Sequence, residues 1–181
     1  MINESGILFP QLEPEAVDLP FGTRSGAGVI FGVTGGVTEA VIRRVASDKS
    51  LASLDAIAFS GVRGMDGVKE ARVPYGDRVL KIAVVSGLGN AEKLIQKIKS
   101  GVHYDLVEVM ACPGGCVAGA GQPVSDRQNK ADRGKALYAA DKLSNIKRAE
   151  ENPLMLTLYQ GLLKGRVHEL LHVEYKAKKE D

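Results

Sequence analysis

The sequence predicts an α/β fold in which a mixed, twisted sheet is flanked by helices. Two strand-like runs, VKEARVPY and RVLKIAVVS, flank the turn dipeptide Gly76-Asp77, as in a hairpin. A helical run and another strand-like run then follow in alternation. With 181 residues and 44% hydrophobic content, the chain can bury a substantial core. We therefore expect residues 1–181 to form a single domain.

The N-terminal part begins irregularly. Residues 1–20 contain three prolines and little periodicity, so we expect a lead-in without regular structure that packs on the rest of the fold. Residues 28–36 predict a short apolar strand that runs into a glycine turn, and Thr38–Ala46 predicts a helix. A further strand is expected around Ala56–Phe59.

The middle of the chain predicts a strand, a helix and a strand in succession. Asn90 can cap a helix over residues 91–100, which stops at Gly101. Residues 105–110 again form a strand-like run. The connection is long enough for a right-handed parallel crossover, so the segment after Met110 is expected at the carboxyl end of a strand. Ligand sites of open α/β sheets gather at that edge.

The C-terminal part predicts helices. One spans about Asp126 to Leu143, and another begins at Pro153 with Asn152 as its cap. Residues 164–181 form a C-terminal tail.

Charge and hydropathy exclude two classes of partner. The 24 basic and 22 acidic residues leave a net charge of only +2, too little to hold a nucleic-acid backbone. No apolar run approaches the roughly 20 residues that cross a bilayer, and the N-terminus lacks a signal-peptide pattern. We therefore expect no membrane span and place the chain in the cytoplasm. In that reducing compartment a close cysteine pair more often indicates metal or redox chemistry than a structural disulfide.

The two cysteines lie in a loop with almost no side-chain volume. Between Ala111 and Gly121 every residue is Gly or Ala except Cys112, Pro113, Cys116 and Val117. Glycine lets the backbone approach a bulky inorganic group and turn its amides toward it, and thiolates hold iron–sulfur clusters. The alternatives are inert buried thiols beside a tight turn or a labile redox pair. The glycine density favours a cofactor.

Several segments together resemble a known family. Residues 108–123, EVMACPGGCVAGAGQP, are similar to the last cluster-binding motif of iron-only (FeFe) hydrogenases. Residues 29–44, VIFGVTGGVTEAVIRR, resemble the segment that covers the active site in that family. ENPLMLTLYQGLLKG and HELLHVEY resemble its C-terminal helix and tail. The departures are Ala118, Ala120 and the ending LLHVEY, where many members have Asn, Gly and LLHTHY.

The resemblance implies one lobe of a two-lobed hydrogenase catalytic domain. Its cofactor is the H-cluster, a 4Fe-4S cubane joined through a cysteine sulfur to a two-iron unit carrying CO and cyanide. By motif position Cys112 would ligate the cubane and Cys116 would bridge to the two-iron unit. Met110 would lie against that unit, and its pocket would be lined by Phe31, Gly32 and Val37.

The resemblance also implies that part of the site is elsewhere. Two upstream family motifs, which supply the other two cubane ligands, are not in this sequence. The partner would be an N-terminal half or a second subunit, and without it we expect no hydrogen turnover. A naturally split enzyme, a fragment of a longer protein and a relative without the chemistry all fit. The alternative function is a non-catalytic iron–sulfur assembly or interaction protein with a similar loop.

Three weaker patterns compete with this interpretation. His168-Glu-Leu-Leu-His172 matches the zinc-protease pattern H-E-x-x-H, with little room for a third ligand downstream. Gly32, Gly35 and Gly36 before a helix suggest an anion cradle without matching a nucleotide motif. Basic stripes could dock a ferredoxin-like electron carrier, although such stripes are usually solvated faces; they comprise Lys93, Lys97, Lys99, Arg127, Lys130 and Arg133. A surface meant for the other lobe would also favour self-association.

Overall fold

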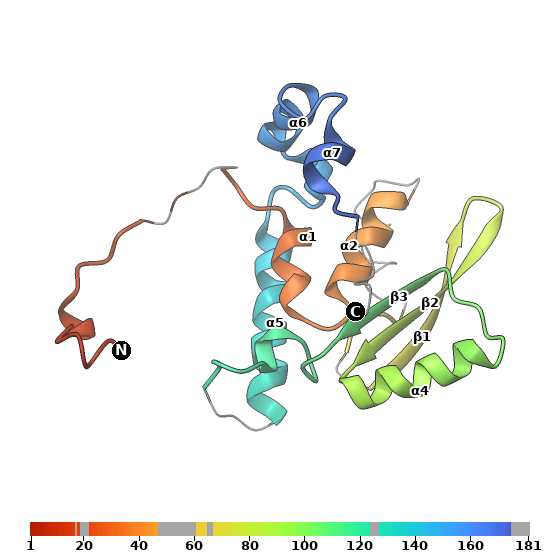
Figure 1. Ribbon diagram of the computed structural model, residues 1–181, viewed down its shortest axis with the longest axis horizontal. Coiled ribbons are helices and arrows are strands. Elements are labelled where there is room, and N and C mark those ends of the chain that lie inside the picture. Colours follow the sequence, from red (N-terminus) through yellow and green to blue (C-terminus); the bar gives the residue numbers. More distant parts are fainter. Residues whose placement is uncertain (17, 19–21, 47–60, 65–66, 124–126, 175–181) are drawn as a thin grey trace, which may run out of the picture.

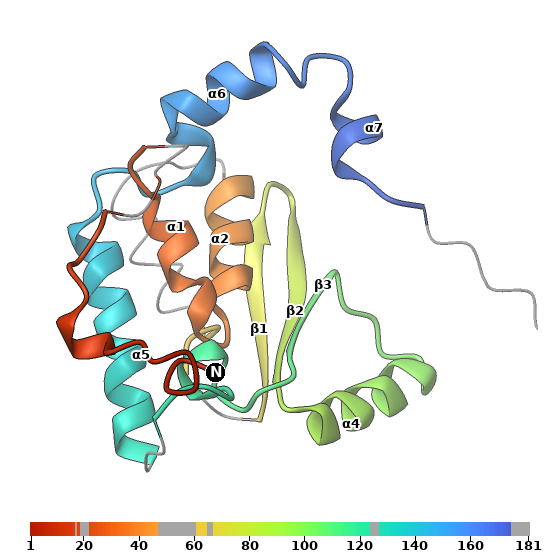
Figure 2. The same cartoon turned by 60° about the vertical axis from the view of Figure 1, so that its left-hand side comes forward.

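The computed structural model describes residues 1–16, 18, 22–46, 61–64, 67–123 and 127–174. It confirms the mixed α/β class, with a three-stranded sheet between helices (Figure 1). Helix α4 (Leu88–Lys99) covers one face of the sheet, and α2 (Gly36–Val45) lies on the other (Figures 1 and 2). Helix α5 (Arg127–Leu143) packs outside α2, beside α1 (Gly26–Val29). The expected strand around Ala56–Phe59 lies outside the described residues.

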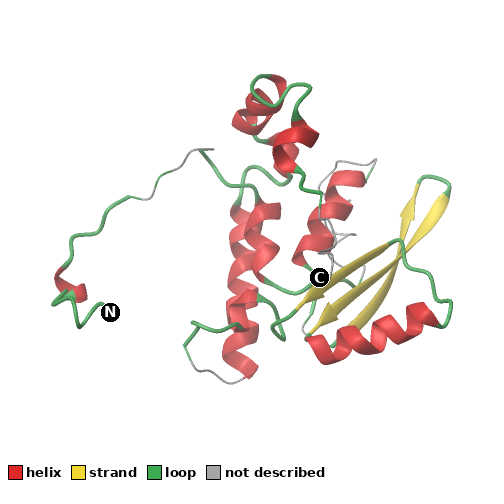
Figure 3. Ribbon diagram, viewed as in Figure 1, coloured by secondary structure: helices red, strands yellow, loops and turns green. Residues whose placement is uncertain are grey.

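The sheet has the predicted hairpin and crossover. Strands β1 (Val68–Tyr75) and β2 (Arg78–Ser86) pair antiparallel across the turn at Gly76-Asp77. Strand β3 (Leu106–Met110) pairs parallel to β2 after the α4 crossover. The parallel pairing brings the ends of β2 and β3 to the same edge of the sheet, where the cysteine loop begins (Figure 3).

The central strand β2 is buried on both faces, because successive side chains point to opposite sides of a strand. Ile82 and Val84 pack with α2 in a cluster completed by Ile42, Val62, Ala71 and Val73. Ala83 and Val85 pack with α4 in a second cluster, with Leu94 and Tyr104. The sheet therefore separates two hydrophobic cores.

The prediction of a cap at Asn90 was wrong. Helix α4 starts three residues earlier than expected, at Leu88, with Gly87 as its N-cap residue. The Asn90 side chain lies inside the first turn and donates to the Ser86 carbonyl at 2.7 Å. The expected end was correct, since α4 stops at Lys99 and Gly101 follows with a positive φ of 98°.

The predicted strand at residues 28–36 was also wrong. This segment forms α1 and the 3-10 turn Ile30–Gly32. The Ser25 hydroxyl caps the helix by accepting the Gly28 amide, and the buried Gly26, Ala27 and Ile30 have helical rather than alternating spacing. A short apolar run does not distinguish a strand from a buried helix, and here packing against α5 decides for the helix.

The helix that begins at Pro153 agrees with the prediction from the sequence. Asn152 caps α6 (Pro153–Gln160) by accepting the Leu154 amide, as predicted. The tail contains α7 (Val167–Leu171), and a 3-10 turn, Ala149–Glu151, precedes α6. The lead-in is irregular apart from the turn Phe9–Gln11, but residues 1–16 are exposed and extend away from the body, contrary to the expected packing (Figure 1).

A buried ion network joins α2 to α5. The Arg43 guanidinium pairs with Glu39 at 2.6 Å and with both carboxylate oxygens of Asp141 at 2.8 and 2.7 Å. The Arg63 guanidinium donates to both carboxylate oxygens of Glu39, at 2.7 and 2.8 Å, and stacks over the Tyr138 ring. Although burial opposes the charged form, these hydrogen bonds and charges raise the pKa of Arg43 above its usual range.

We predict that Arg43→Ala lowers the free energy of unfolding by about 3–5 kcal/mol, because it leaves Asp141 buried without its cation. Urea denaturation followed by circular dichroism measures this. Arg166→Ala, which removes a fully exposed pair with Glu169, is the control and should change nothing measurable. Equal effects of the two substitutions would contradict the structural role of the network.

A second prediction concerns pH. The Tyr104 hydroxyl donates to the Glu70 carboxylate, and this bond raises the pKa of Tyr104 to about 12. A raised pKa gives stability that is complete below the ordinary value of 10.0 and is lost as pH rises through about 12. The stability advantage of the wild type over Tyr104→Phe should therefore shrink across that window. Two tyrosines deprotonate late in an ultraviolet titration, because burial also raises the pKa of Tyr138 to about 12. Glu70→Gln should move one of these two late steps to lower pH; a titration in which neither step moves would refute the assignment.

Candidate functional site: the cysteine loop

The cysteine loop leaves β3 at the carboxyl edge of the sheet and presents two thiols to solvent. Cys112 and Cys116 are both free and exposed. The loop turns tightly between them, with the Gly115 amide donating to the Cys112 carbonyl at 2.9 Å. Gly114 and Gly115 have positive φ values of 95° and 89°, which side-chain-bearing residues rarely adopt. The glycine pair therefore makes the turn that separates the thiols.

The loop is held by hydrogen bonds to residues at the end of β2 and in the turn that follows α1. The Gly114 amide donates to the Ser86 hydroxyl at 2.7 Å, and its carbonyl accepts from the Thr34 amide at 3.2 Å. The Met110 carbonyl accepts from the Gly87 amide at 2.7 Å. Ser86 and Gly114 are both buried. Protein contacts alone thus fix where the loop begins.

Gly115 lies directly against the turn that follows α1. A Cβ placed on Gly115 would lie 2.8 Å from the Gly32 carbonyl oxygen and 2.8 Å from the Thr34 amide nitrogen. Both are backbone atoms and cannot move aside independently. Two glycine turns distant in sequence are therefore in backbone contact, which needs glycine at position 115.

Glu108 ties the strand before the cysteines to α2. Its carboxylate is buried and accepts the amides of Gly35 and Thr38, each at 2.6 Å. These amides lie at the start of α2, where the helix dipole favours a negative charge. The anion in the suggested cradle is therefore a side chain of the protein itself. The amides of Gly35 and Thr38 already donate to it and are not available to a phosphate.

Arg133 of α5 secures the far part of the loop. Its guanidinium donates to the Val117 carbonyl at 3.0 Å and to the Pro123 carbonyl at 3.1 Å. The Val117 side chain is buried with Ile30 and Val33 in a third hydrophobic cluster. Arg133 thus positions the loop rather than contributing to a free basic stripe. Lys97 of the other stripe pairs with Glu70 at 3.1 Å.

The structure brings some of the predicted site residues together. Cys112 and Cys116 share one loop, and the half-buried Met110 ends β3 directly before it. A Cβ on Gly32 would lie 4.0 Å from Val117. Val37 is half-buried in the first turn of α2. Phe31 is 48% exposed and lines a hollow of about 600 Å³ with residues of α2 and α6, not with residues of the cysteine loop.

Sequence reasoning missed Ser86, Glu108 and Thr34, and it assigned Arg133 to a basic stripe where the structure has it binding the loop. Glu108 gave one signal, since it is a lone charge inside the strand-like run LVEVM. The hydroxyls of Thr34 and Tyr138 are buried without a hydrogen-bond partner among the described residues. Both residues line a second hollow, of about 330 Å³, beside Gly114 and Val117. Two unpaired buried hydroxyls in such a space indicate room for ordered water.

The donor set fits part of an iron–sulfur site. Two exposed thiols are suitable cluster ligands, and a Cβ on Gly119 would lie 3.5 Å from the Cys112 sulfur, so the absence of a side chain there keeps that sulfur open. The described residues contain no group of three or more His, Cys, Asp or Glu side chains that could hold a metal. The two free thiols are half the number of ligands that a cubane held by four thiolates needs.

These observations define a class of protein: an α/β fold with a two-cysteine loop at the carboxyl edge of its sheet. Comparison with known families then shows that the chain belongs to the family of the iron-only hydrogenase large subunit, C-terminal domain, whose model matches residues 1–120. Residues 127–178 match the model of the iron hydrogenase small subunit. The family implies iron–sulfur and H-cluster cofactors.

The relatives include both hydrogenases and assembly proteins. The NADP-reducing hydrogenase subunit HndD of Solidesulfovibrio fructosivorans is 41% identical over 97% of this chain and 31% of its own length. Iron hydrogenase 1 of Clostridium pasteurianum is 38% identical over 97% of this chain and 33% of its length. The cytosolic iron-sulfur assembly component 3 of Mus musculus is more distant, at 29% identity over 98% of this chain.

Solved structures give the same family. An apo form of FeFe-hydrogenase HydA1 from Chlamydomonas reinhardtii is 36% identical with a TM-score of 0.64, covering 96% of this chain and 52% of that chain. The chain thus spans about half of this structure and about a third of the curated hydrogenases. Across the described residues no helix has the length and apolarity to span a bilayer. One relative is a periplasmic hydrogenase large subunit, so the cytoplasmic location stays a prediction.

We predict that Gly115→Ala destabilises the protein more than Gly121→Ala. Both glycines have a φ of 89°, which side-chain-bearing residues rarely adopt, so alanine costs about 1–3 kcal/mol of backbone strain at either position. Only position 115 adds a collision with backbone, whereas a Cβ on Gly121 meets nothing within 4 Å. Urea denaturation of the two variants measures the difference. Equal losses would show that the backbone contact with Gly32 and Thr34 has no energetic consequence.

Proposed function

We propose that the chain forms one lobe of an FeFe-hydrogenase catalytic domain and supplies Cys112 and Cys116 as two ligands of its H-cluster. The observation that carries the proposal is the pair of exposed thiols on a loop whose backbone is fixed by Ser86 and Thr34. In this assignment Cys112 binds the cubane and Cys116 bridges to the two-iron unit. The whole site would interconvert hydrogen with protons and electrons.

The chain's own part in this chemistry is to hold ligands in place. Ser86 and Glu108 fix the loop and the facing turn through buried hydrogen bonds, so the thiols need little reorganisation to meet a cluster. When bound, the cluster would supply the redox chemistry and the place where dihydrogen is formed or split. Met110, Gly32 and Val37 form the wall beside it; Phe31 joins them if its side chain leaves the hollow near α6.

The remaining ligands come from an N-terminal half or a partner subunit. A cubane needs four thiolates, and this chain has two cysteines. The match to the small-subunit model supports the existence of hydrogenases divided between chains. A split enzyme and a piece of a longer protein both satisfy this requirement. A ferredoxin-like protein is the proposed electron carrier, and the cytoplasm the proposed location.

Exposed apolar side chains support the proposed partner and self-association. Val107 and Val109 on β3 are 37% and 47% exposed, and Leu88 at the start of α4 is 65% exposed. Surfaces of this kind associate when their natural cover is absent. Light scattering that gives a mass above 19.3 kDa for the isolated chain would agree with self-association.

The second candidate function, iron–sulfur cluster assembly, has weaker support. It rests on relatives that are 28 to 31% identical, against 41% for the hydrogenase subunit. In both functions the cysteine loop would hold iron. Only the hydrogenase would make hydrogen once the second lobe is present.

The decisive experiment joins the chain with the N-terminal part of a hydrogenase catalytic domain under anaerobic conditions and supplies iron, sulfide and the two-iron unit. We expect hydrogen evolution from the pair and none from either part alone. Cys112→Ser should lower cubane iron, and Cys116→Ser should abolish hydrogen evolution. Iron binding without hydrogen evolution by the pair would favour the assembly function. No bound iron in the pair would refute both.

Ser86 provides a separate prediction. Ser86→Ala leaves the buried Gly114 amide unpaired, at a cost of about 1–3 kcal/mol, and frees the loop at the first glycine. We expect a lower midpoint in urea and a changed reduction potential of the reconstituted pair. Ser100→Ala, at the exposed end of α4, is the matched control. An unchanged potential in Ser86→Ala would show that the hydroxyl does not position the ligands.

A further inference from the structure

Two histidines on the C-terminal tail are left unused by the proposed function. His168 and His172 are both exposed, and their ring centroids lie 4.9 Å apart with an angle of 34° between the planes. Helix α7 ends at Leu171, but the His172 amide still donates to the His168 carbonyl at 3.2 Å. The helical spacing therefore persists to His172, and the two rings lie one turn apart on the same face.

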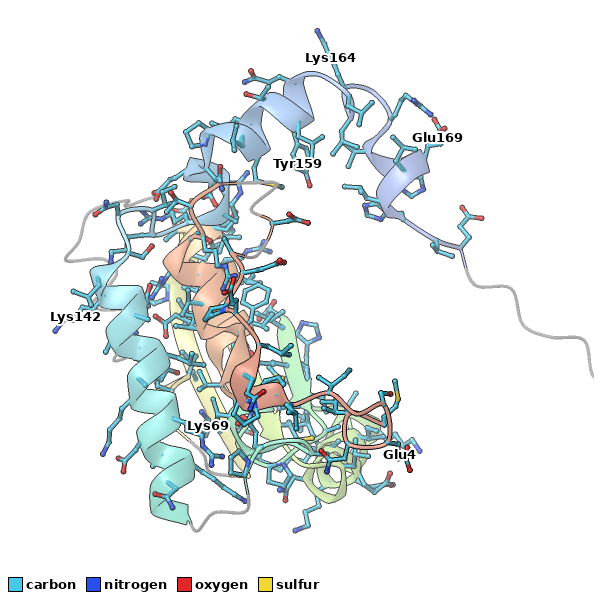
Figure 4. All side chains as sticks on the ribbon, turned by 90° about the vertical axis from the view of Figure 1, so that its left-hand side faces the viewer. Glu4, Lys69, Lys142, Tyr159, Lys164 and Glu169 are labelled. Carbon is cyan, nitrogen blue, oxygen red and sulfur yellow. The ribbon has the colours of Figure 1, made fainter. Side chains whose placement is uncertain are left out.

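The glutamate between them does not complete a protease site. Glu169 pairs with Arg166 through two hydrogen bonds, of 3.1 and 2.7 Å. Figure 4 shows its side chain projecting from α7 away from the sheet. The general base of an H-E-x-x-H protease must face the metal-bound water, and a third protein ligand must hold the ion. Neither requirement is met by the described residues, since they contain no three-residue metal group.

The rings themselves are available for binding. Among residues 1–16, 18, 22–46, 61–64, 67–123 and 127–174, no hydrogen bond or ion pair engages either imidazole, and the two rings contact each other. Imidazole nitrogen suits zinc, copper and nickel, whereas magnesium and calcium prefer oxygen ligands. Two imidazoles one turn apart can both reach one ion.

We propose that His168 and His172 form a surface site for one divalent transition-metal ion, of the zinc, nickel or copper type. The two imidazoles supply two coordination positions, and water fills the others. The bound ion bridges the last turn of α7, a helix of five residues that is too short to be stable by itself. Because the ion binds the folded turn better than the unfolded chain, it stabilises the tail.

The test uses the full chain with Cys112→Ser and Cys116→Ser, because thiolates bind the same ions. Copper(II) is titrated in, and pulsed electron paramagnetic resonance detects the ligand nitrogens. We expect one ion per chain with the signature of two imidazoles. His168→Ala or His172→Ala should weaken binding by about tenfold or more. Zinc should raise the helix signal in circular dichroism of the background chain but not of the His168→Ala, His172→Ala chain.

The remaining histidine provides a matched control. The His103 side chain is 82% exposed and lies 3.6 Å from Asp105. It belongs to the connection between α4 and β3 and not to the tail. His103→Ala should leave affinity, stoichiometry and signature unchanged. Unchanged copper affinity after removal of both tail histidines would overturn the proposal, as would a signal from fewer than two imidazoles. Since the cluster thiols are absent throughout, the result is independent of the hydrogenase assignment.

Discussion

The buried Glu108 carboxylate is the constraint on which the site depends. A carboxylate taken out of water must be satisfied by donors, and here those donors are two amides at the start of α2. The same residue lies on β3, two positions before Met110. One side chain therefore sets the distance between the sheet and the glycine turn that faces the cysteines. Contacts of Ser86, Thr34 and Gly115 with the loop and the turn add to the one that Glu108 makes between them.

The elements with clear periodicity could be predicted from sequence. The hairpin, the crossover to β3, α5 and α6 each show a pattern that depends on neighbours within about ten positions. Residues 28–36 could not be assigned correctly, because a short apolar run fits a strand and a helix equally well. What decides is the contact of α1 with α5, more than a hundred positions away. The start of α4 was misplaced because asparagine can also bond inside the first turn.

The chemistry of the candidate site could be predicted from the sequence, but the residues that hold the cysteine loop in place could not. The run of glycine and alanine around Cys112 and Cys116 indicated a cofactor loop, and the motif indicated the family. Nothing in the local sequence pairs Ser86 with Gly114, or Arg43 with Asp141, because these partners meet only after the chain has folded. The anion at the start of α2 shows the limit well. The glycines before the helix suggested a cradle for an anion, and only the tertiary structure shows that the negative charge there is Glu108.

The continuity of the chain past the cysteine loop has a consequence for assembly. Residues 1–120 and 127–178 match models of two different subunits, yet here they are one polypeptide. The contacts of Arg43 with Asp141 and of Arg133 with the loop cross that division. Tethering makes such docking intramolecular, with an effective concentration that dilution cannot change. In a two-chain arrangement the same contacts would have to be established by collision and would weaken as the protein is diluted.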